Sequence, residues 1–292
     1  MTTSRSITVG QFSASPVLAA ASALGLDARQ DLQIVTSRVP SSPGQFASLR
    51  DGEIDVAVTS PDNVLLYATT DRNPLGERLD VRMVRAIDRG LGLTLVTDPA
   101  VSAVEQFRGA ALGVDVIRSG FALLLFTMLD RLGVDRAEVT FPERGSTPKR
   151  LESLITGEID GTILNAESRV GALGAGMRPW STSTDVSENY LGTVLAVPAG
   201  IDPDLASAVT RMWDEATGWL LESSEADVIE CLAATSPVLG NADYVRLIRD
   251  PAFGLLLDPQ VPIADLQVLT DIRRSCGAYA PGDEDLAGLV GL

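Results

Sequence analysis

An eight-residue pattern that occurs twice constrains the fold of this chain more than any other feature of its sequence. Leu49–Val56 reads LRDGEIDV and Leu154–Gly161 reads LITGEIDG, so Gly-Glu-Ile-Asp recurs unchanged at an offset of 105 residues, from Gly52 to Gly157. In each copy the glycine is placed to end a helix, the isoleucine to enter a core, and the aspartate to begin a buried strand. The repeat predicts two α/β lobes that share one local device. Chance recurrence of a common helix-to-strand connector is the alternative.

Short β-branched runs alternate with helical patterns around these two copies. Strands are expected at Ile7–Phe12, Leu32–Val39, Ile54–Thr59, Val81–Ile87, Leu91–Thr97, Ala111–Val116, Val139–Phe141, Ile159–Leu164 and Tyr190–Pro198. Helices are expected at Val17–Leu26, Gln45–Arg50, Ser102–Phe107, Phe121–Leu132, Arg150–Thr156, Pro203–Glu222, Ser224–Ala234, Ala242–Arg249 and Ile263–Arg274. This alternation predicts an α/β protein with a largely parallel sheet and a helical C-terminal third.

Length and charge restrict the class of protein further. At roughly 150 residues per domain, 292 residues correspond to about two domains. The hydrophobic share of 45% and the charged share of 21% are those of a globular chain. With 39 acidic and 23 basic residues the formal net charge is −16, which argues against a nucleic-acid or anionic-membrane partner. A small molecule is therefore the expected partner, and a local basic pocket is compatible with this charge.

The chain contains no histidine, which excludes Ser-His-Asp and Cys-His catalysis and every histidine-ligated metal or haem site. Its two cysteines, Cys231 and Cys276, fit neither a metal motif nor a disulfide framework. Two idle thiols are favoured, and a single bridge stays open. We expect no metal and no cofactor.

The N-terminal segment has some features of a signal peptide. Ala19–Ala23 imitates a cleavage site, but polar residues and a proline interrupt the apolar run before it, namely Gln11, Ser13, Ser15 and Pro16. The apolar run Gly120–Leu129 is too short to span a bilayer. We therefore expect no membrane span and a cytoplasmic location for the sequence as written. Removal of an export signal would instead make the location periplasmic or extracellular.

The order of several segments resembles the type 2 periplasmic-binding-protein superfamily, the solute-binding proteins, and most of all its nitrate/sulfonate/taurine and thiamine-pyrimidine branch. The segments are ITVGQF with its Ser-rich turn, the paired L-x-x-G-E-I-D copies, RAIDRGLGLTLVTDP leading into FRGAALGV, and the Gly120 helix. The resemblance implies a ligand held between two lobes that are joined by two crossovers, near Leu93–Asp98 and Leu191–Val197. Lobe one would comprise residues 1–95 plus 190–292, and lobe two residues 96–189.

Open α/β sheets bind ligands beyond the carboxyl ends of their strands, which selects candidate loops independently of any family. The candidate ligand-binding residues are Gln11, Ser13, Ser15, Ser60, Asp62, Asn63, Arg118, Ser119, Gly120, Arg144, Asn165 and Glu167. Helix-start N–H groups and the Arg118 guanidinium suit a carboxylate, sulfonate or phosphate. The alternatives are helix capping, Asx turns and surface ion pairs. Near the predicted hinge, Asp88 and Arg89 are placed either to contact a ligand or to form ion pairs.

Two functions follow from this layout. The first is binding of a small anionic or polar organic molecule of the carboxylate, sulfonate or pyrimidine type, with hinge closure, and with an ABC transporter as partner if the chain is exported. The alternative is an intracellular enzyme on the same scaffold, a cofactor-independent lyase or hydrolase. It would carry out elimination, dehydration, decarboxylation or desulfination of a small organic acid, with Asp62 or Glu167 as acid or base and Arg118 as anion clamp. A cytoplasmic sensor that regulates another protein is a third possibility.

Two chemistries known in the superfamily are disfavoured by the residues present. Desulfinases of this fold use a cysteine in the loop after the first strand, where this chain has Ser13 and Ser15. Thiamine-pyrimidine synthases depend on a histidine, which this chain lacks.

Overall fold

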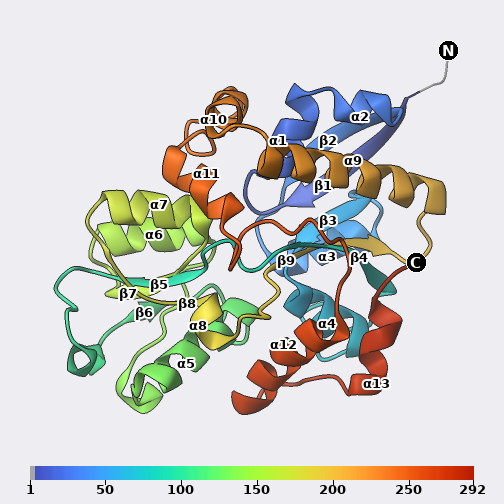
Figure 1. Ribbon diagram of the computed structural model, residues 1–292. Coiled ribbons are helices and arrows are strands. Elements are labelled where there is room, and N and C mark those ends of the chain that lie inside the picture. Colours follow the sequence, from blue (N-terminus) through green and yellow to red (C-terminus); the bar gives the residue numbers. More distant parts are fainter. Residues whose placement is uncertain (1–3) are drawn as a thin grey trace.

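The structure, a computed structural model, describes residues 4–292 and contains two β-sheets, each with helices packed around it. The five-stranded sheet has the order β2-β1-β3-β9-β4, and the four-stranded sheet has the order β6-β7-β5-β8. The strands are β1 (Arg5–Gln11), β2 (Leu32–Arg38), β3 (Val56–Thr59), β4 (Val81–Asp88), β5 (Thr94–Thr97), β6 (Leu112–Gly113), β7 (Gly161–Leu164), β8 (Arg178–Thr182) and β9 (Thr193–Pro198). The predicted α/β class and the two lobes are confirmed, and Figure 1 shows the lobes side by side.

Both sheets are mixed, so the expectation of a largely parallel sheet is wrong. β1 pairs in parallel with β2 and β3, whereas β9 lies antiparallel between β3 and β4. In the second sheet β6 and β7 are parallel, and β5 is antiparallel to both β7 and β8. The antiparallel strands β5 and β9 are those next to the crossovers, because each enters its sheet from the other lobe.

The longer helices surround these sheets in chain order. They are α1 (Pro16–Ala23), α3 (Ser42–Arg50), α4 (Pro61–Thr69), α5 (Gly120–Leu132), α6 (Thr147–Ile155), α7 (Ala166–Gly174), α9 (Pro203–Glu222), α10 (Glu225–Ala233), α11 (Ala242–Arg249) and α12 (Ile263–Ser275). Single-turn helices are α2 (Leu26–Arg29), α8 (Ser183–Val186) and α13 (Asp283–Leu286). Among residues 4–292, no helix has the length and apolar character that crossing a membrane requires.

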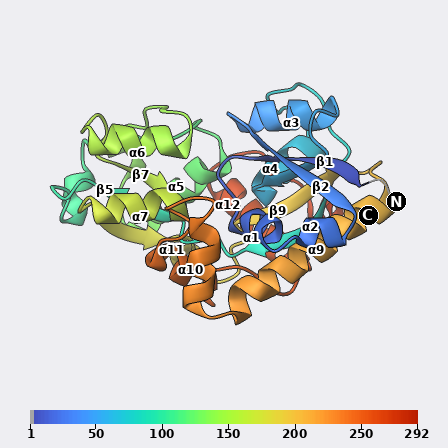
Figure 2. The same cartoon turned by 90° about the horizontal axis from the view of Figure 1, so that it is seen from above.

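The chain passes between the lobes twice. It leaves the first sheet at the end of β4 and enters the second at β5, so residues 89–93 form one crossover. It returns between β8 and β9 through α8 and residues 187–192. Figure 2 shows the two lobes from above with these connections between them. Residues 94 and 95, which the sequence analysis assigned to lobe one, pair with β7 and β8 in the second sheet.

The two Gly-Glu-Ile-Asp copies have the same structure. Gly52 follows α3 and Gly157 follows α6, each with a φ of 73°, a left-handed conformation that favours glycine. Ile54 and Ile159 are buried, each against a strand glycine of its own sheet. The predicted helix stop and core contact are therefore confirmed in both lobes.

The aspartate of each copy binds the neighbouring strand in the same way. Asp55 Oδ2 accepts the backbone N–H of Thr8 at 2.8 Å, and Asp160 Oδ2 accepts that of Ala111 at 2.7 Å. In each case the aspartate N–H also donates to the carbonyl of the same residue. This two-way contact sets the register of the strand that follows the repeat.

The C-terminal helices contact both lobes. α11 packs against α7, and α12 packs against α5, although α9 to α13 follow the return of the chain to the first lobe. Figure 1 shows α11 and α12 on either side of the crossovers. Cys231 and Cys276 are both free thiols.

Several predicted strands form only in part. Of the predicted strand Ala111–Val116, only Leu112–Gly113 is a strand, β6. Residues 91–93 precede β5 as a turn, and residues 139–141 make an isolated bridge between Thr140 and Ala111 in place of a strand. β8 and α7 were not predicted as elements. α7 begins at the loop that the sequence analysis had recognised only as a strand end.

Candidate functional site

A cavity of about 280 Å³ lies between the two lobes. Its walls come from the carboxyl ends of β1, β3 and β7, from the loops after β2 and β6, and from both crossovers. This is the position at which open α/β sheets bind ligands. The cavity is therefore the candidate site.

Six helices begin at this cavity. Their N-cap residues all line it: Ser15 of α1, Ser41 of α3, Ser60 of α4, Ser119 of α5, Ser146 of α6 and Asn165 of α7. Three of these helices belong to each lobe. The first N–H groups of a helix have no partner within the helix, and the helix dipole makes this end positive. Six such ends at one cavity favour an anionic or electron-rich ligand group.

Arg150 supplies a buried cation to the same cavity. Arg150 is 2% exposed and lines the cavity from α6. Nε donates to Thr162 Oγ1 at 3.0 Å, and the terminal nitrogens donate to the Gly145 carbonyl at 2.6 Å, to Thr147 Oγ1 at 3.1 Å and to the Ile163 carbonyl at 3.3 Å. All these partners are neutral. Within the described residues, no carboxylate forms an ion pair with Arg150.

Burial lowers the pKa of Arg150, and the nearby charge of Asp115 raises it in part. Asp115 also lines the cavity, but its carboxylate already accepts the hydroxyl of Ser119. A guanidinium stays protonated despite such a shift. Arg150 therefore brings a positive charge to the cavity wall that the protein does not neutralise by direct contact.

Asp88 contributes the opposite charge at the first crossover. It ends β4, is 1% exposed and lines the cavity. Oδ1 accepts the Gly90 N–H at 2.8 Å, whereas Oδ2 has no partner in hydrogen-bond geometry among the described residues. Burial raises the pKa of Asp88 to about 6, and the Thr193 hydroxyl and the Gly90 N–H offset part of this rise.

Eight of the twelve predicted ligand-binding residues line the cavity. They are Ser13, Ser15, Ser60, Asn63, Ser119, Gly120, Asn165 and Glu167. Most of their side chains are also engaged locally: Ser15, Ser60, Ser119 and Asn165 each accept a helix N–H as caps. Asn165 reaches across the cavity as well, because its amide donates to Ser13 Oγ at 3.1 Å and so joins the two lobes.

The other four predicted residues do not line it. The Gln11 side-chain oxygen accepts the Ser15 N–H at 3.1 Å, which uses it within the first turn. Arg118 lies exposed on the loop before α5. Arg144 lies 3.8 Å from a Glu158 carboxylate oxygen. These side chains leave the strand ends in directions that the sequence does not specify.

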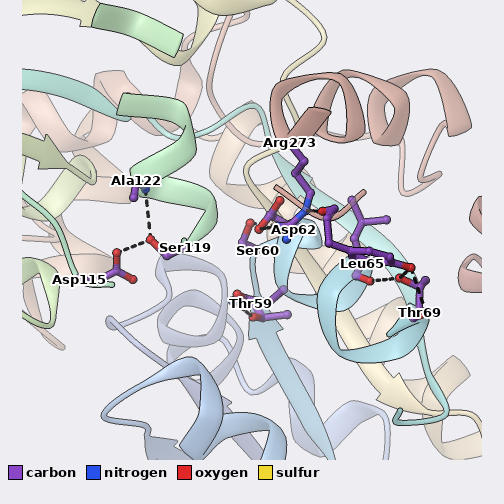
Figure 3. A network of polar contacts seen from close by, with 11 residues as sticks. Thr59, Ser60, Asp62, Leu65, Thr69, Asp115, Ser119, Ala122 and Arg273 are labelled. Carbon is purple, nitrogen blue, oxygen red and sulfur yellow. Dashed lines mark hydrogen bonds and ion pairs between the residues drawn. The ribbon is translucent and has the colours of Figure 1, made fainter. Parts of the chain in front are cut away.

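The fourth is Asp62, which is committed to a buried ion pair. Arg273 of α12 approaches Asp62 Oδ2 at 2.6 Å, with the two side chains 3% and 5% exposed. Figure 3 shows Arg273 reaching Asp62 at the start of α4, and Ser119 bonded to Asp115 on the loop that leads into α5. Asp62 therefore fixes α12 to α4 and is not placed to act as an acid or base in the cavity.

Sequence reasoning did not select Arg150 or Tyr244, both of which line the cavity. A signal for Arg150 was present, because it lies 105 residues after Gln45, the offset of the repeat. For Asp88 and Arg89 the sequence left two roles open, contact with a ligand or formation of an ion pair. Asp88 lines the cavity, whereas Arg89 forms an ion pair with Asp265. Over residues 4–292, no cluster of three or more Cys, Asp or Glu side chains is arranged to hold a metal ion.

No protein-family model and no curated protein sequence matches this chain. Solved structures match it along nearly its full length. The alkanesulfonate-binding protein SsuA from Xanthomonas axonopodis pv. citri, bound to MOPS, has a TM-score of 0.76 at 17% identity, covering 98% of this chain and 97% of that chain. The ligand-binding component of an ABC-type import system from Staphylococcus aureus, with zinc bound, has a TM-score of 0.72 at 15% identity, covering 97% and 95%.

A Candida albicans gene product described as having the generic periplasmic binding protein fold gives a TM-score of 0.74 at 14% identity, covering 98% of this chain and 95% of that chain. The type 2 periplasmic-binding-protein fold implied by the sequence resemblance is thus confirmed. At these identities the likeness concerns the fold, and the site has to be argued from its own residues.

Proposed function

We propose that the protein binds a small organic anion, a sulfonate or carboxylate, in the cavity between its lobes and closes on it by hinge motion. The observation that carries this proposal is that six helix N-termini meet at one cavity together with the buried guanidinium of Arg150, which forms no ion pair within residues 4–292. Each helix start offers N–H donors and a partial positive charge, and Arg150 offers a full charge.

The overall negative charge of the protein makes the local positive charge of the cavity the feature that decides whether an anion binds. The chain carries a net charge of −16, so its general field repels anions. Only a site that combines local donors with exclusion of water can reverse that field, since the interactions of buried charges are screened far less than those of surface charges. The two lobes supply that exclusion, and the Asn165–Ser13 hydrogen bond shows that they meet across the cavity.

The fold gives the binding step its mechanism. The two crossovers, residues 89–93 and 187–192, are the covalent links between the sheets and the natural hinge. A ligand that contacts helix starts of both lobes stabilises the closed arrangement by its differential affinity for that state. Anion binding and closure are then one event.

A melting-temperature screen tests the proposal. The panel contains aliphatic and aromatic sulfonates, sulfinates, carboxylates and pyrimidines, with alkylammonium salts of equal ionic strength as controls. We expect the melting temperature to rise with the concentration of one class of anion, as ligand linkage requires. No shift with any anion, or an equal shift with the alkylammonium salts, would overturn the proposal.

The second candidate function is an enzyme on this scaffold, and one residue favours it. Glu167 lines the cavity, and no hydrogen bond or ion pair within the described residues engages its carboxylate. It is therefore free to exchange a proton with a bound molecule. Mass spectrometry of the best ligand after incubation separates the two functions: an unchanged mass supports binding, and catalytic loss with a new mass supports a lyase or hydrolase.

A further inference from the structure

The hinge side of the cavity carries two carboxylates, Asp88 and Glu167, that form no ion pair within residues 4–292. Asp88 Oδ2 is buried without a hydrogen-bond partner, and the Glu167 carboxylate has none among residues 4–292. Asp88 comes from the end of β4 and Glu167 from the first turn of α7, so the two lobes contribute one carboxylate each.

Tyr244 of α11 joins these two carboxylates. It lines the cavity and is buried. α11 packs against α7, the helix that carries Glu167, and Leu255, which follows α11 in the chain, forms a bridge with Asp88. Burial raises the pKa of Tyr244, and the charges of Glu167 and Asp88 raise it further. The phenol therefore stays protonated. Two carboxylates around one tyrosine form a pocket for a hydrogen-bond donor of positive charge.

The charges that line the cavity favour an anion that also carries a positively charged group. One guanidinium, Arg150, stands against three carboxylates, Asp88, Asp115 and Glu167. Asp115 is partnered by Ser119, whereas Asp88 Oδ2 and the Glu167 carboxylate have no hydrogen-bond partner among residues 4–292. A ligand with only an anionic group would leave both of them desolvated and unpaired when the lobes close, and an unpaired buried charge is costly.

We propose that the ligand is bipolar: its anionic group lies at Arg150 and the helix starts, and a protonated amine on the same molecule lies between Asp88 and Glu167. This inference rests on the proposed function, because it assigns the second half of the same cavity. The volume of about 280 Å³ suits a compact molecule rather than a drug-sized one. Charge pairing at both ends makes an ω-amino sulfonate or ω-amino carboxylate the best-fitting class.

Matched ligand pairs test this assignment by calorimetry. We would titrate the full chain with 3-aminopropanesulfonate and propanesulfonate, and with 4-aminobutanoate and butanoate. The amine-bearing member of at least one pair should bind on the order of 30-fold more tightly, the effect of one well-formed charge-assisted contact.

Variants separate the two ends of the cavity. The double variant D88N/E167Q should bring the affinity ratio within a pair close to one while still binding the plain anion. R150Q should weaken both members of a pair. Glu230 on α10 is exposed and does not line the cavity, so E230Q is the matched control and should keep the wild-type ratio. Circular dichroism melting of each variant verifies that it is folded.

The outcomes distinguish this inference from the proposed function. If wild type binds both members of every pair equally, or if D88N/E167Q keeps the preference for the amine, the bipolar assignment is overturned and anion binding stands. If wild type binds neither member of any pair and no other anion, the proposed function fails, and this inference fails with it.

Discussion

Gln45 and Arg150 occupy the same place in the two lobes. Each is the fourth residue of its helix, α3 or α6, and they are separated by the 105 residues of the repeat. The Gln45 amide donates to the carbonyls of Gly10 and Val58 at 3.1 Å each, which joins the helix to two strands. Arg150 makes the equivalent contacts with β7, through Thr162 and the Ile163 carbonyl.

Comparison with Gln45 distinguishes the structural contacts of Arg150 from the role of its charge. A neutral amide is sufficient for the helix-to-strand contact in lobe one, so the guanidinium of lobe two is more than that contact requires. Gln45 does not line the cavity, whereas Arg150 does. The charge at position 150 is therefore best explained by the ligand.

The replacement R150Q should leave the fold intact. It gives lobe two the residue that lobe one already uses. It also removes a desolvated charge that has no ion-pair partner in the part of the chain that the structure describes. We expect the free energy of unfolding to change by less than about 1 kcal/mol, measured by urea denaturation without ligand. A loss above about 3 kcal/mol would show that the guanidinium is primarily structural.

The replacement D62N should destabilise the protein strongly. It leaves Arg273 buried without its carboxylate, and removal of one partner of a buried pair costs about 3–5 kcal/mol. The matched control is E215Q, which breaks an exposed pair with Arg29 and should cost less than about 1 kcal/mol. Equal losses for the two variants in denaturant unfolding would contradict this account of Asp62.

Gly120 should not tolerate a side chain. A Cβ atom there would lie 2.7 Å from Asp62 Oδ2, and the ion pair with Arg273 prevents that carboxylate from moving aside. We expect G120A to cost about 1–3 kcal/mol of unfolding free energy. Gly218 in α9 has open space around it, so G218A should stabilise by about 0.5–1 kcal/mol. A neutral G120A would mean that α4 and α5 are free to separate.

The stability of the unliganded protein should depend on pH through Asp88. Its pKa rises from 3.8 to about 6 on folding, so the folded state holds this proton more tightly. Ionisation of Asp88 therefore opposes folding above about pH 6, by up to about 3 kcal/mol, and this cost vanishes below about pH 4. D88N should be more stable than wild type at about pH 7.5 and equal to it near pH 4. A difference between them that stays constant with pH would contradict the buried, unpaired Asp88 Oδ2.

The sequence predicted those features of the fold that are determined by residues close together in the chain. The glycine, isoleucine and aspartate of each repeat work within a few residues, so Gly52 and Gly157 marked both helix ends correctly. The starts of α1 and α5 were also readable, since serine caps and early prolines carry their meaning in the sequence. This is why the strand-end loops selected eight residues that line the cavity. By contrast, α3 and α6 begin three residues before their predicted ranges, and α7 was not predicted.

The rest depended on side-chain direction and distant partners. Asp62 had the position of a ligand residue, but its partner Arg273 lies 211 residues away. The helix that contains Arg273 was predicted, but its packing against α4 was not. Arg118 was chosen for its charge next to a helix start, and the backbone leaves it exposed. Arg150 was overlooked because an arginine inside a helix gives no local sign of burial, and only alignment with Gln45 would have shown it.

The most direct test of anion binding is calorimetric titration of wild type, R150Q and R118Q with the anion that stabilises the protein most. Both variants lose one positive charge, but only Arg150 lines the cavity. We predict that R150Q weakens binding at least about 30-fold, roughly 2 kcal/mol, while R118Q stays within about a factor of two of wild type. Wild-type affinity in R150Q, or equal weakening in both variants, would contradict the assignment of Arg150 and the cavity as the anion site.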